Sequence, residues 1–553
     1  MPTFYDQLTT TCAGYGDRPA LVHEGNVRSW RQLSVDVDTV AAGLLHRGIN
    51  RGDKIAVWLP NGPEWTIVWL AAASIGAAVV PLNTRYRTDE VAYVLRQSES
   101  AMLVTLPGML GIDFRAMVTH LLGEDAWETG IVHRPEEFPA LRHLVYVDGP
   151  DDHGLASFAS LLSPAEGTSP ARLAERRRQV VETDDVILVY TSGTTGFPKG
   201  ARHDHTKLSD VAAMADLMSV TAEDRILAHM PNFHVGGAFL SIVTSLVTGA
   251  AQVCLAVFHP REALRLIAEQ RCTVINGVPS HFIMMLTELR EARFDLSSSR
   301  IGWIAGAMIP PEVVTGIRDQ FGMNLLTMYG MTETTGVTTA TRPGDDLEVL
   351  LTTVGTTIGD DYEVQVTNPS TGRPLPAGEQ GEIWVRGHRV TSGYYEMPQE
   401  TAESLLADGW FRTGDLGRQR DDGRLQITGR LKDMFIVGGT NTYPAEIEAV
   451  LFQLEAVEQA YVVGVPDERL GEVGMAFIQV KNGHLLTREE VLEHCAARMA
   501  NYKRPRYVEF TGTFPMTATG KVQKYKLRDD AIKALHLEEV AARRLLDYTS
   551  SPH

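Results

Sequence analysis

A loop rich in hydroxyl groups and glycines, at residues 190–200, is the part of this sequence whose chemistry is easiest to read. It holds five hydroxyl side chains, three glycines and one lysine, in the order Tyr-Thr-Ser-Gly-Thr-Thr-Gly-Phe-Pro-Lys-Gly. The apolar run Val-Ile-Leu-Val at 186–189 precedes it and predicts a buried strand. Small residues let backbone N–H groups approach an anion, and hydroxyl groups and Lys199 add donors and charge. We interpret the loop as a polyphosphate site, with a plain surface turn as the alternative.

The spacing of this loop differs from a Walker A loop, in which four residues separate a first glycine from a Gly-Lys pair that a Ser or Thr follows. Here Gly193 is followed by Gly196, Lys199 and Gly200. The candidate phosphate-binding residues are Thr191, Ser192, Gly193, Thr194, Thr195 and Lys199.

Two acidic residues are candidates for the rest of a nucleotide site. Glu333 follows Tyr-Gly-Met-Thr at 329–332, and an acid near a polyphosphate is repulsive unless a cation such as Mg²⁺ lies between them. The alternative is a helix N-terminal acid favoured by the helix dipole, with Thr332 as the cap. Asp415 follows a Gly turn, where its carboxylate can accept both ribose hydroxyls or simply form an Asx turn.

Composition limits the partners and the class of protein. The chain has 553 residues, which predicts two or more domains. Its 51 Lys and Arg against 69 Asp and Glu give a net charge of −18, which argues against nucleic acid and anionic membranes as partners. Cys12, Cys254, Cys272 and Cys495 form no C-x-x-C pair, and the N-terminus shows no signal pattern, so we expect reduced thiols and a cytoplasmic location.

The order of elements predicts an α/β fold with a large N-terminal domain of several subdomains. Apolar runs at 54–59, 101–104 and 274–278 alternate with helical patterns and predict parallel-type sheets. The apolar window at 67–82 predicts a buried helix running into a strand, not a membrane span. The Arg- and Glu-rich segment 171–181 predicts a solvated surface helix.

Later segments predict two further units. Short strands with tight turns at 382–387 and 423–429 predict a small β-rich subdomain. Beyond it, a helix at 444–454, strands at 459–465 and 474–480 and a helix at 487–499 predict a compact α+β domain. We place the domains at 1–431 and 432–553.

Five motifs in order resemble those of the adenylate-forming enzymes, which include acyl-CoA synthetases, luciferases and peptide-synthetase adenylation domains. The motifs lie at 190–200, 329–333, 394–415 with Tyr394-Tyr395 and Arg412-Thr413-Gly414-Asp415, 429–433, and 515–521. The resemblance extends over nearly the whole chain. The resemblance implies ATP, Mg²⁺ and coenzyme A as cofactors and substrates and a mobile C-terminal domain. It implies these nucleotide-binding residues beside the phosphate loop: Gly306, Ala307, Met308, Tyr329, Gly330, Met331, Thr332, Asp415, Ile427 and Arg430.

The same resemblance assigns roles to the catalytic residues. Glu333 would bind the metal, Thr332 would contact phosphate, and Lys521 would neutralise charge as a carboxylate attacks the α-phosphate. Lys432 would be the hinge of the C-terminal domain. In amino-acid-activating relatives, an Asp near this position pairs with the ammonium group of the substrate. This sequence has Phe233-His234 there instead, so we expect a carboxylic acid without an amino group as substrate.

The acyl pocket is expected to be mostly apolar, with no basic residue for a second carboxylate and no bulky Trp that would shorten it to acetate size. Its candidate residues are Phe233, His234, Val278, Ser280, Phe282, Met308, Met328, Met331 and Val337. Gly438, Gly439, Lys503 and Arg504 are the candidate contacts for coenzyme A. The pair His203 and His205 looks like a metal cluster, but the resemblance places ordinary helix surface there.

We therefore expect an ATP-dependent acyl-CoA ligase for a medium-chain, branched, alicyclic or aromatic monocarboxylic acid. A ligase that loads a carrier protein, a luciferase-like oxygenase and a non-catalytic nucleotide sensor stay open as alternatives. We expect no integral membrane segment and leave open whether the protein is a homodimer.

Overall fold

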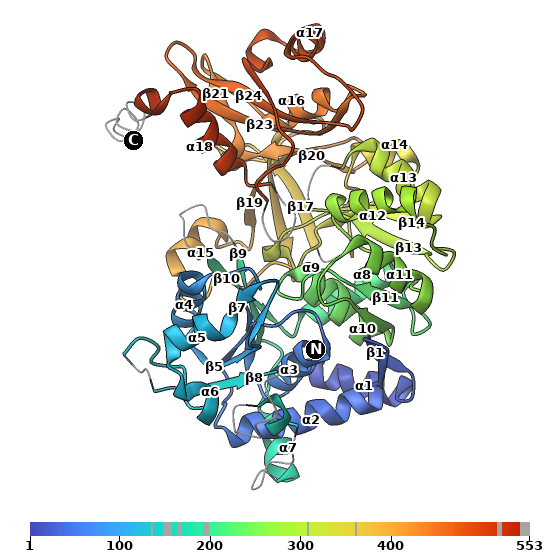
Figure 1. The fold of residues 1–553 in the computed structure, drawn as a ribbon, viewed down its shortest axis with the longest axis vertical. Helices are drawn as coiled ribbons and strands as arrows, with labels where there is room; N and C mark the ends of the chain where they lie inside the picture. Colours follow the sequence, from blue (N-terminus) through green and yellow to red (C-terminus); the bar gives the residue numbers. More distant parts are fainter. Residues whose placement is uncertain are drawn as a thin grey trace. The chain divides into compact units, whose positions relative to one another are not determined.

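The computed structural model describes residues 1–133, 136–147, 157–162, 169–191, 198–306, 309–359, 362–516 and 522–541. The chain divides into two compact units. The first consists of Met1–Leu351, Gly355–Glu363 and Val385–Phe411, and the second of Thr352–Val354, Val364–Trp384 and Arg412–His553. Both units mix helices with sheets, so the α/β fold class is confirmed (Figure 1).

One sheet of the first unit carries the strand that leads into the phosphate loop. Its order is β10 (Lys199–Asp204), β9 (Asp185–Thr191), β4 (Ala78–Pro81), β3 (Lys54–Val57), β5 (Ser100–Thr105) and β8 (His143–Tyr146). All neighbours are parallel except β10, which is antiparallel to β9. The strands predicted at 54–59, 101–104 and 186–189 are confirmed as β3, β5 and β9.

Both faces of this sheet are covered, as expected of parallel strands that read as continuous apolar runs. Alternate residues point to opposite faces: Ile55 and Val57 of β3 join one hydrophobic cluster, and Ala56 joins another. The first cluster includes α2 (Trp30–His46) and α3 (Pro63–Ser74), the second α4 (Thr88–Gln97) and α5 (Phe114–Leu122). Helix α3 is buried all round, so the window at 67–82 is confirmed as a helix running into β4.

A second layer of strands in the first unit runs β2 (Asn26–Ser29), β1 (Pro19–His23), β12 (Ala251–Cys254) and β11 (Arg225–Ala228). A further sheet has the order β13 (Ile301–Ile304), β14 (Asn324–Tyr329), β15 (Thr339–Ala340) and β16 (Thr356–Thr357). Val274 bridges Ile226 of β11 and Ile301 of β13 in parallel, which joins the two. The strand predicted at 274–278 is thus wrong as a regular strand, because only Val274 and Gly277 form bridges.

Helices cover the two faces of this layer as well. Leu227, Ile275 and Ile304 share a cluster with α11 (Pro260–Gln270), α12 (Pro279–Glu291) and α13 (Pro311–Phe321), which lie together beside β13 and β14 in Figure 1. On the other face, Ile226 and Trp303 share a cluster with residues of α8 (Lys207–Leu217).

The second unit contains most of a four-stranded sheet and the C-terminal sheet. The former has the order β17 (Tyr362–Thr367), β18 (Gly381–Gly387), β19 (Phe411–Gln419) and β20 (Leu425–Arg430). The latter has the order β22 (Thr440–Thr442), β21 (Phe435–Val437), β24 (Gly471–Val480) and β23 (Val457–Asp467), with β25 (Tyr507–Phe510) paired to β24. The strands expected at 382–387, 423–429, 459–465 and 474–480 are confirmed.

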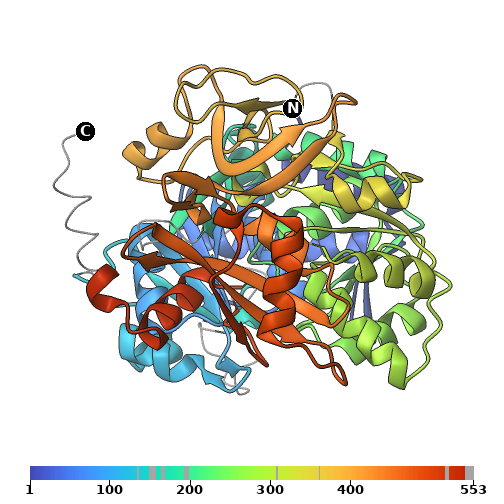
Figure 2. The same ribbon diagram turned by 90° about the horizontal axis from the view of Figure 1, so that it is seen from above.

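Strands β23 and β24 lie side by side in Figure 2 and carry helices on both faces. Ala460 and Val462 share a cluster with α16 (Pro444–Leu451) and α17 (Arg488–Arg498), while Val463 and Val465 share one with α18 (Lys524–Ala534). The helices expected at 444–454 and 487–499 are thus confirmed as α16 and α17 with shorter ends.

The remaining elements are short or peripheral. They are α1 (Phe4–Tyr15), β6 (Gly108–Met109), β7 (Ile112–Asp113), α6 (Asp125–Thr129), η1 (Phe158–Ser160), α7 (Pro170–Arg178), α9 (Val235–Gly237), η2 (Ala238–Val243), α10 (Thr244–Thr248), η3 (Thr332–Thr334), α14 (Leu347–Thr352), α15 (Pro398–Ser404), η4 (Leu431–Asp433) and η5 (Asn501–Lys503). Helix α7 confirms the surface helix predicted at 171–181. No helix in the described ranges is both long and apolar enough to cross a bilayer.

Candidate active site

Four predicted site residues lie at or just beyond the carboxyl ends of parallel backbone segments in the first unit, along the same edge. Gly306 follows β13, Tyr329 ends β14, Val278 follows the bridge at Gly277, and His234 lies six residues beyond β11. These strands run parallel, with Ile304 opposite Thr327 and Gly277 opposite Ile304. The carboxyl ends of parallel strands are where open α/β sheets bind ligands. The fold therefore gathers the predicted adenine and acyl residues along one edge.

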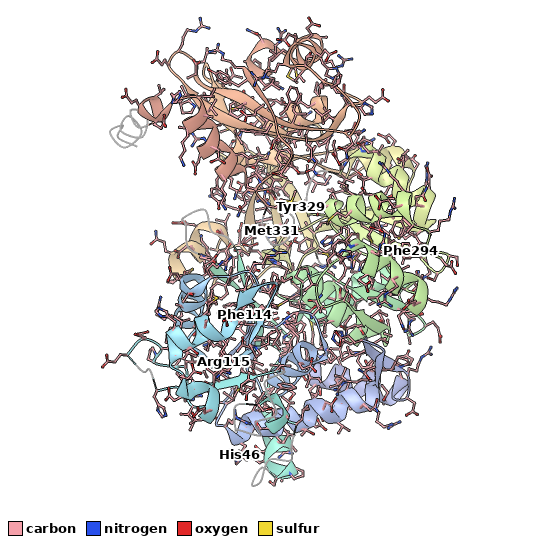
Figure 3. The ribbon with its side chains drawn as sticks, in the orientation of Figure 1. His46, Phe114, Arg115, Phe294, Tyr329 and Met331 are labelled. Atoms are coloured by element: carbon pink, nitrogen blue, oxygen red, sulfur yellow. The ribbon has the colours of Figure 1, made fainter. Side chains whose placement is uncertain are left out.

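The turn that follows β14 presents Thr332 and Glu333. Its backbone is closed by hydrogen bonds from Thr338 N to Tyr329 O at 2.7 Å and from Gly336 N to Met331 O at 2.9 Å. A Cβ at Gly330 would lie 2.3 Å from Gly336 O, so only glycine permits this close approach. Figure 3 shows Tyr329 and Met331 close together at the end of β14. This tight turn therefore requires glycine at position 330, and the turn carries the predicted metal ligand Glu333 and the predicted phosphate contact Thr332.

Glu333 is buried, and its carboxylate has a specific donor. The Tyr394 hydroxyl donates to Glu333 Oε1 at 2.9 Å. Burial, together with the negative charge of Glu333, raises the pKa of Tyr394 above its usual range, so the phenol stays protonated. This contact joins residues 61 positions apart.

Glu333 suits Mg²⁺ by its chemistry. A carboxylate oxygen is a hard ligand, and Mg²⁺ commonly takes one or two carboxylates and fills its remaining positions with phosphate oxygens and water. Within the described ranges, no three His, Cys, Asp or Glu residues gather into an all-protein metal site. A single protein carboxylate is therefore consistent with Mg²⁺ that arrives with a nucleotide.

The phosphate loop is the connection between β9 and β10. Thr191 at the end of β9 pairs with Lys199 at the start of β10, so these two described residues lie at the carboxyl end of β9, which is parallel to β4. Ser192, Gly193, Thr194 and Thr195 lie outside the described residues. The Lys199 ammonium lies 5.2 Å from the centroid of the Tyr394 ring. Tyr394 thus contacts both the predicted phosphate lysine and the predicted metal ligand.

Three of the predicted acyl-pocket residues pack into one apolar cluster. Val278, Met328 and Val337 belong to it together with Met230 and Trp303. Residues two apart in a strand share a face, so Trp303 of β13 lies in this cluster together with Ile301. The alternation of residues along β13 could have indicated this from the sequence. Trp303 therefore lies in the same cluster as three of the predicted acyl-pocket residues, and whether it limits the length of the acyl group stays a prediction to be tested.

The other predicted acyl-pocket residues that the structure describes lie outside the cluster of Val278. The rings of Phe233 and His234 lie 4.8 Å apart just before α9. Phe282 is fully buried in the neighbouring cluster, edge-on to Phe321, so it does not share the cluster of Val278. Ser280 is partly buried in the first turn of α12. Ala307 and Met308 lie outside the described residues.

The second unit holds the predicted ribose residues. Asp415 on β19 lies opposite Arg430 on β20, and Asp415 Oδ1 is 2.9 Å from Arg430 Nε. Gly414, with φ +70°, turns the strand, and the Asp415 backbone N–H donates to Thr413 Oγ1. Ile427 lies on the same hairpin, opposite Gly417. The structure therefore brings Asp415 and Arg430 into direct contact.

The residues predicted for coenzyme A also lie in the second unit. Gly438 and Gly439 form the two-residue turn between β21 and β22, with φ +56° and +83°, a geometry that favours glycine. Lys503 is paired with Glu446, and this hydrogen bond raises the Lys503 pKa. Arg504 donates to the carbonyls of Met499 and Ala496 at the end of α17, which gives it a structural role that the sequence did not suggest.

Two further predicted residues complete the second unit. Lys432 is exposed in the short helix η4. Lys521 lies outside the described residues.

The histidine pair near β10 corrects one expectation. His203 lies on β10 and His205 directly after it, and both are fully buried rather than on a helix surface. The Phe4 backbone N–H donates to His205 Nδ1, while the His203 ring packs against Phe239. Burial lowers the pKa of His203 to about 3 and that of His205 to about 4, so both are neutral at pH 7.

Two family models match separate parts of the chain. The family model described as AMP-binding enzyme matches residues 8–395, and the model described as AMP-binding enzyme C-terminal domain matches residues 446–521. A propanoyl:CoA ligase of Mycobacterium tuberculosis, whose acyl group carries a methyl-dioxo-octahydroindenyl ring system, is 36% identical over 515 residues, 93% of this chain and 96% of its own.

Two other proteins show the same likeness. The mitochondrial medium-chain acyl-CoA ligase ACSF2 of Mus musculus is 33% identical over 540 residues, 96% of this chain and 88% of its own. The crystal structure of ATP-bound MatB from Rhodopseudomonas palustris superposes with a TM-score of 0.81 at 27% identity, over 96% of this chain and 98% of that one.

Proposed function

Because the chain belongs to the AMP-binding enzyme family and is an adenylate-forming acid–CoA ligase, we propose that it activates a medium-chain, branched, alicyclic or aromatic monocarboxylic acid. The observation that carries this proposal is the apolar cluster of Val278, Met328, Val337 and Trp303 beside the strand ends of Gly306 and Tyr329. An apolar acyl group would be desolvated there. The ring-bearing and medium-chain acyl groups named for two relatives agree with such a pocket.

The proposed reaction has two steps. A carboxylate oxygen of the acid attacks the α-phosphorus of ATP, and the bond to the β-phosphate oxygen breaks to release pyrophosphate. The coenzyme A thiolate then attacks the acyl carbon of the acyl-adenylate, and AMP leaves with the electron pair of the C–O bond. Positioning and charge neutralisation are the main contributions that a protein makes to phosphoryl transfer.

In the first unit, we propose the following roles. The loop before Lys199 and Lys199 itself bind the phosphates, and Thr332 donates its hydroxyl to them. Tyr329 and the backbone at Gly306 hold the adenine between an aromatic face and a residue without a side chain. Glu333 would hold Mg²⁺, which when bound would neutralise charge on the phosphate oxygens. His234 lies near the acyl cluster and contacts the carboxylate of the acid.

In the second unit, Asp415 accepts the ribose hydroxyls while Arg430 fixes its orientation. Lys521 stabilises the charge that develops at the α-phosphate, and Lys432 acts as the hinge between domains 1–431 and 432–553. The Gly438–Gly439 turn lets the pantetheine chain of coenzyme A pass against backbone that carries no side chains. Lys503 gives up its ion pair with Glu446 and binds a phosphate of coenzyme A.

We also propose a cytoplasmic location. The four cysteines are free, and Cys254, Cys272 and Cys495 are buried, which suits a reducing compartment. Assembly as a homodimer stays an open proposal that size-exclusion chromatography with light scattering would decide.

The test is a panel of acids, with ATP and Mg²⁺, in the presence and absence of coenzyme A. The panel runs from acetate through decanoate to cyclohexanecarboxylate, benzoate and cinnamates, and AMP and thioester are measured together. We expect both products to rise together for an apolar monoacid. Acyl-adenylate that free coenzyme A does not discharge would replace this proposal with carrier-protein loading, and nucleotide binding without turnover would replace it with a sensor.

A further inference from the structure

A segment of the first unit, residues 389–395, ties the predicted metal turn to the strand after the phosphate loop; we call it the strap. The Thr391 backbone N–H donates to Glu333 O at 2.7 Å, and Thr391 Oγ1 donates to Arg202 O at 2.8 Å. The Tyr395 backbone N–H donates to Gly200 O at 2.9 Å. The strap therefore bonds to η3 on one side and to β10 on the other.

Tyr394 is the side chain of the strap that contacts both predicted site residues. Its hydroxyl lies 2.9 Å from Glu333 Oε1, and its ring lies 5.2 Å from Lys199 Nζ. Since an ionised carboxylate only accepts hydrogen bonds, the hydroxyl is the donor. Tyr394 and Glu333 are 9% and 6% exposed, so little water competes for either contact.

These contacts leave both functional groups able to act. A carboxylate has two oxygens and about four lone-pair sites, so a hydrogen bond to Oε1 fixes its orientation without using up its capacity to bind a metal. An aromatic face attracts an ammonium group without accepting conventional hydrogen bonds, so the Lys199 N–H groups stay available to phosphate oxygens.

We propose that Tyr394 is a positioning residue that orients the Glu333 carboxylate for Mg²⁺ and holds the Lys199 ammonium for the nucleotide phosphates. The proposal rests on the proposed function, because it needs Mg²⁺ and ATP as ligands. Mg²⁺ requires nearly ideal geometry, and partners that orient a metal's ligands commonly matter 10- to 100-fold for affinity. The neighbouring phenol therefore sets metal affinity through Glu333 without touching the metal.

Tyr395 is a matched control on the same strap. Its hydroxyl donates to Glu99 Oε2 at 2.7 Å and also contacts Lys54, so it touches neither Glu333 nor Lys199. Tyr394→Phe and Tyr395→Phe each remove one hydroxyl and keep the ring. A general loosening of the strap would therefore affect both variants alike.

The experiment measures binding of Mn²⁺ as the metal probe by electron paramagnetic resonance, with the full-length enzyme and the non-hydrolysable α,β-methylene analogue of ATP. We expect Tyr394→Phe to raise the Mn²⁺ dissociation constant about 10- to 100-fold and Tyr395→Phe to change it less than twofold. Tyr394→Leu, which also removes the ring beneath Lys199, is expected to weaken analogue binding without metal, whereas Tyr394→Phe is not. Thermal unfolding establishes that each variant is folded.

A double-mutant cycle tests the route through Glu333. In a Glu333→Gln background, Tyr394→Phe is expected to change kcat/KM less than twofold, because the carboxylate it would orient is gone. Unchanged Mn²⁺ affinity in Tyr394→Phe, or equal weakening in both phenylalanine variants, would overturn the role of Tyr394. Turnover by the wild-type enzyme would in that case still support the proposed function. A wild-type enzyme that binds no metal–nucleotide complex would overturn both.

Discussion

Among the described glycines of the predicted nucleotide site, Gly330 has the closest backbone approach, and this makes Gly330→Ala a strong perturbation. An alanine Cβ would lie 2.3 Å from Gly336 O, 2.5 Å from Gly336 C and 2.6 Å from Val337 N. Ordinary contacts of a Cβ begin at 3.4 Å, so the first of these falls 1.1 Å short. All three atoms belong to the backbone, so no side chain can rotate away. The turn that carries Thr332 and Glu333 must shift by about 1 Å.

A misplacement of about 1 Å costs roughly 100-fold in rate when it moves a positioning group, which corresponds to about 2.7 kcal/mol of transition-state stabilisation. We expect Gly330→Ala to lower kcat/KM for MgATP by about this factor, measured by pyrophosphate release at saturating acid and coenzyme A. The matched control is Gly14→Ala on α1, where a Cβ meets no atom within 4 Å and where activity should stay unchanged.

Thermal unfolding separates this effect from a loss of folding. Overpacking at Gly330 is expected to cost about 1–3 kcal/mol of stability, which leaves a protein of this size folded at 25 °C. Activity of Gly330→Ala within threefold of the wild type would refute the reasoning, because it would mean that the turn opens without moving Thr332 or Glu333 from working positions.

Three other predictions follow from the site and from the buried histidines. Lys521→Ala is expected to slow acyl-adenylate formation about 10²- to 10³-fold, and near-normal formation in a single-turnover assay would contradict its role. Lys432→Pro is expected to spare adenylation and slow thioester formation, whereas equal losses in the two half-reactions would argue against a hinge. His203→Leu is expected to make stability less sensitive to acid. Burial holds the His203 pKa at about 3 against 6.5 when unfolded, so the unfolded state takes up the proton first and stability falls as pH drops below 6.5, by about 2 kcal/mol at pH 5. Parallel thermal midpoints for variant and wild type between pH 8 and pH 5 would contradict this.

Much of the fold was predictable because its strands carry simple signals. Strands β3, β5 and β9 are buried on both faces, so they appear in the sequence as unbroken apolar runs. The segment at 274–278 is also largely apolar but forms only isolated bridges. Asn276 and Gly277 interrupt its apolar side chains, and its backbone bonds are shared irregularly between β11 and β13. The apolar residues at 274, 275 and 278 predicted a strand, but they do not show that its backbone bonds are divided between two neighbouring strands.

The candidate site was predictable where motifs are local and not where contacts are distant. Thr332, Glu333 and the strand before the phosphate loop follow from short patterns. The contact between Tyr394 and Glu333 spans 61 residues, and no spacing rule within either segment indicates it. The burial of His203 was missed for a similar reason, because its partner Phe239 is far away in sequence and only the folded chain brings the two rings together.

The lysines of the first unit show how an acidic chain can still hold a polyphosphate. A net charge of −18 repels a nucleotide at long range, so attraction must come from cations whose donors are available locally. Lys207 is buried and donates to the carbonyls of His388 and Val390, which commits it to structure. The Lys199 ammonium, in contrast, donates no hydrogen bond to the residues that the structure describes and lies 5.2 Å from the centroid of the Tyr394 ring. An aromatic face attracts the positive charge and leaves the N–H donors unused, so Tyr394 can keep the Lys199 ammonium both ordered and available to phosphate. Hydrogen bonds to carbonyl groups, such as those of Lys207, would have to break before a phosphate could bind.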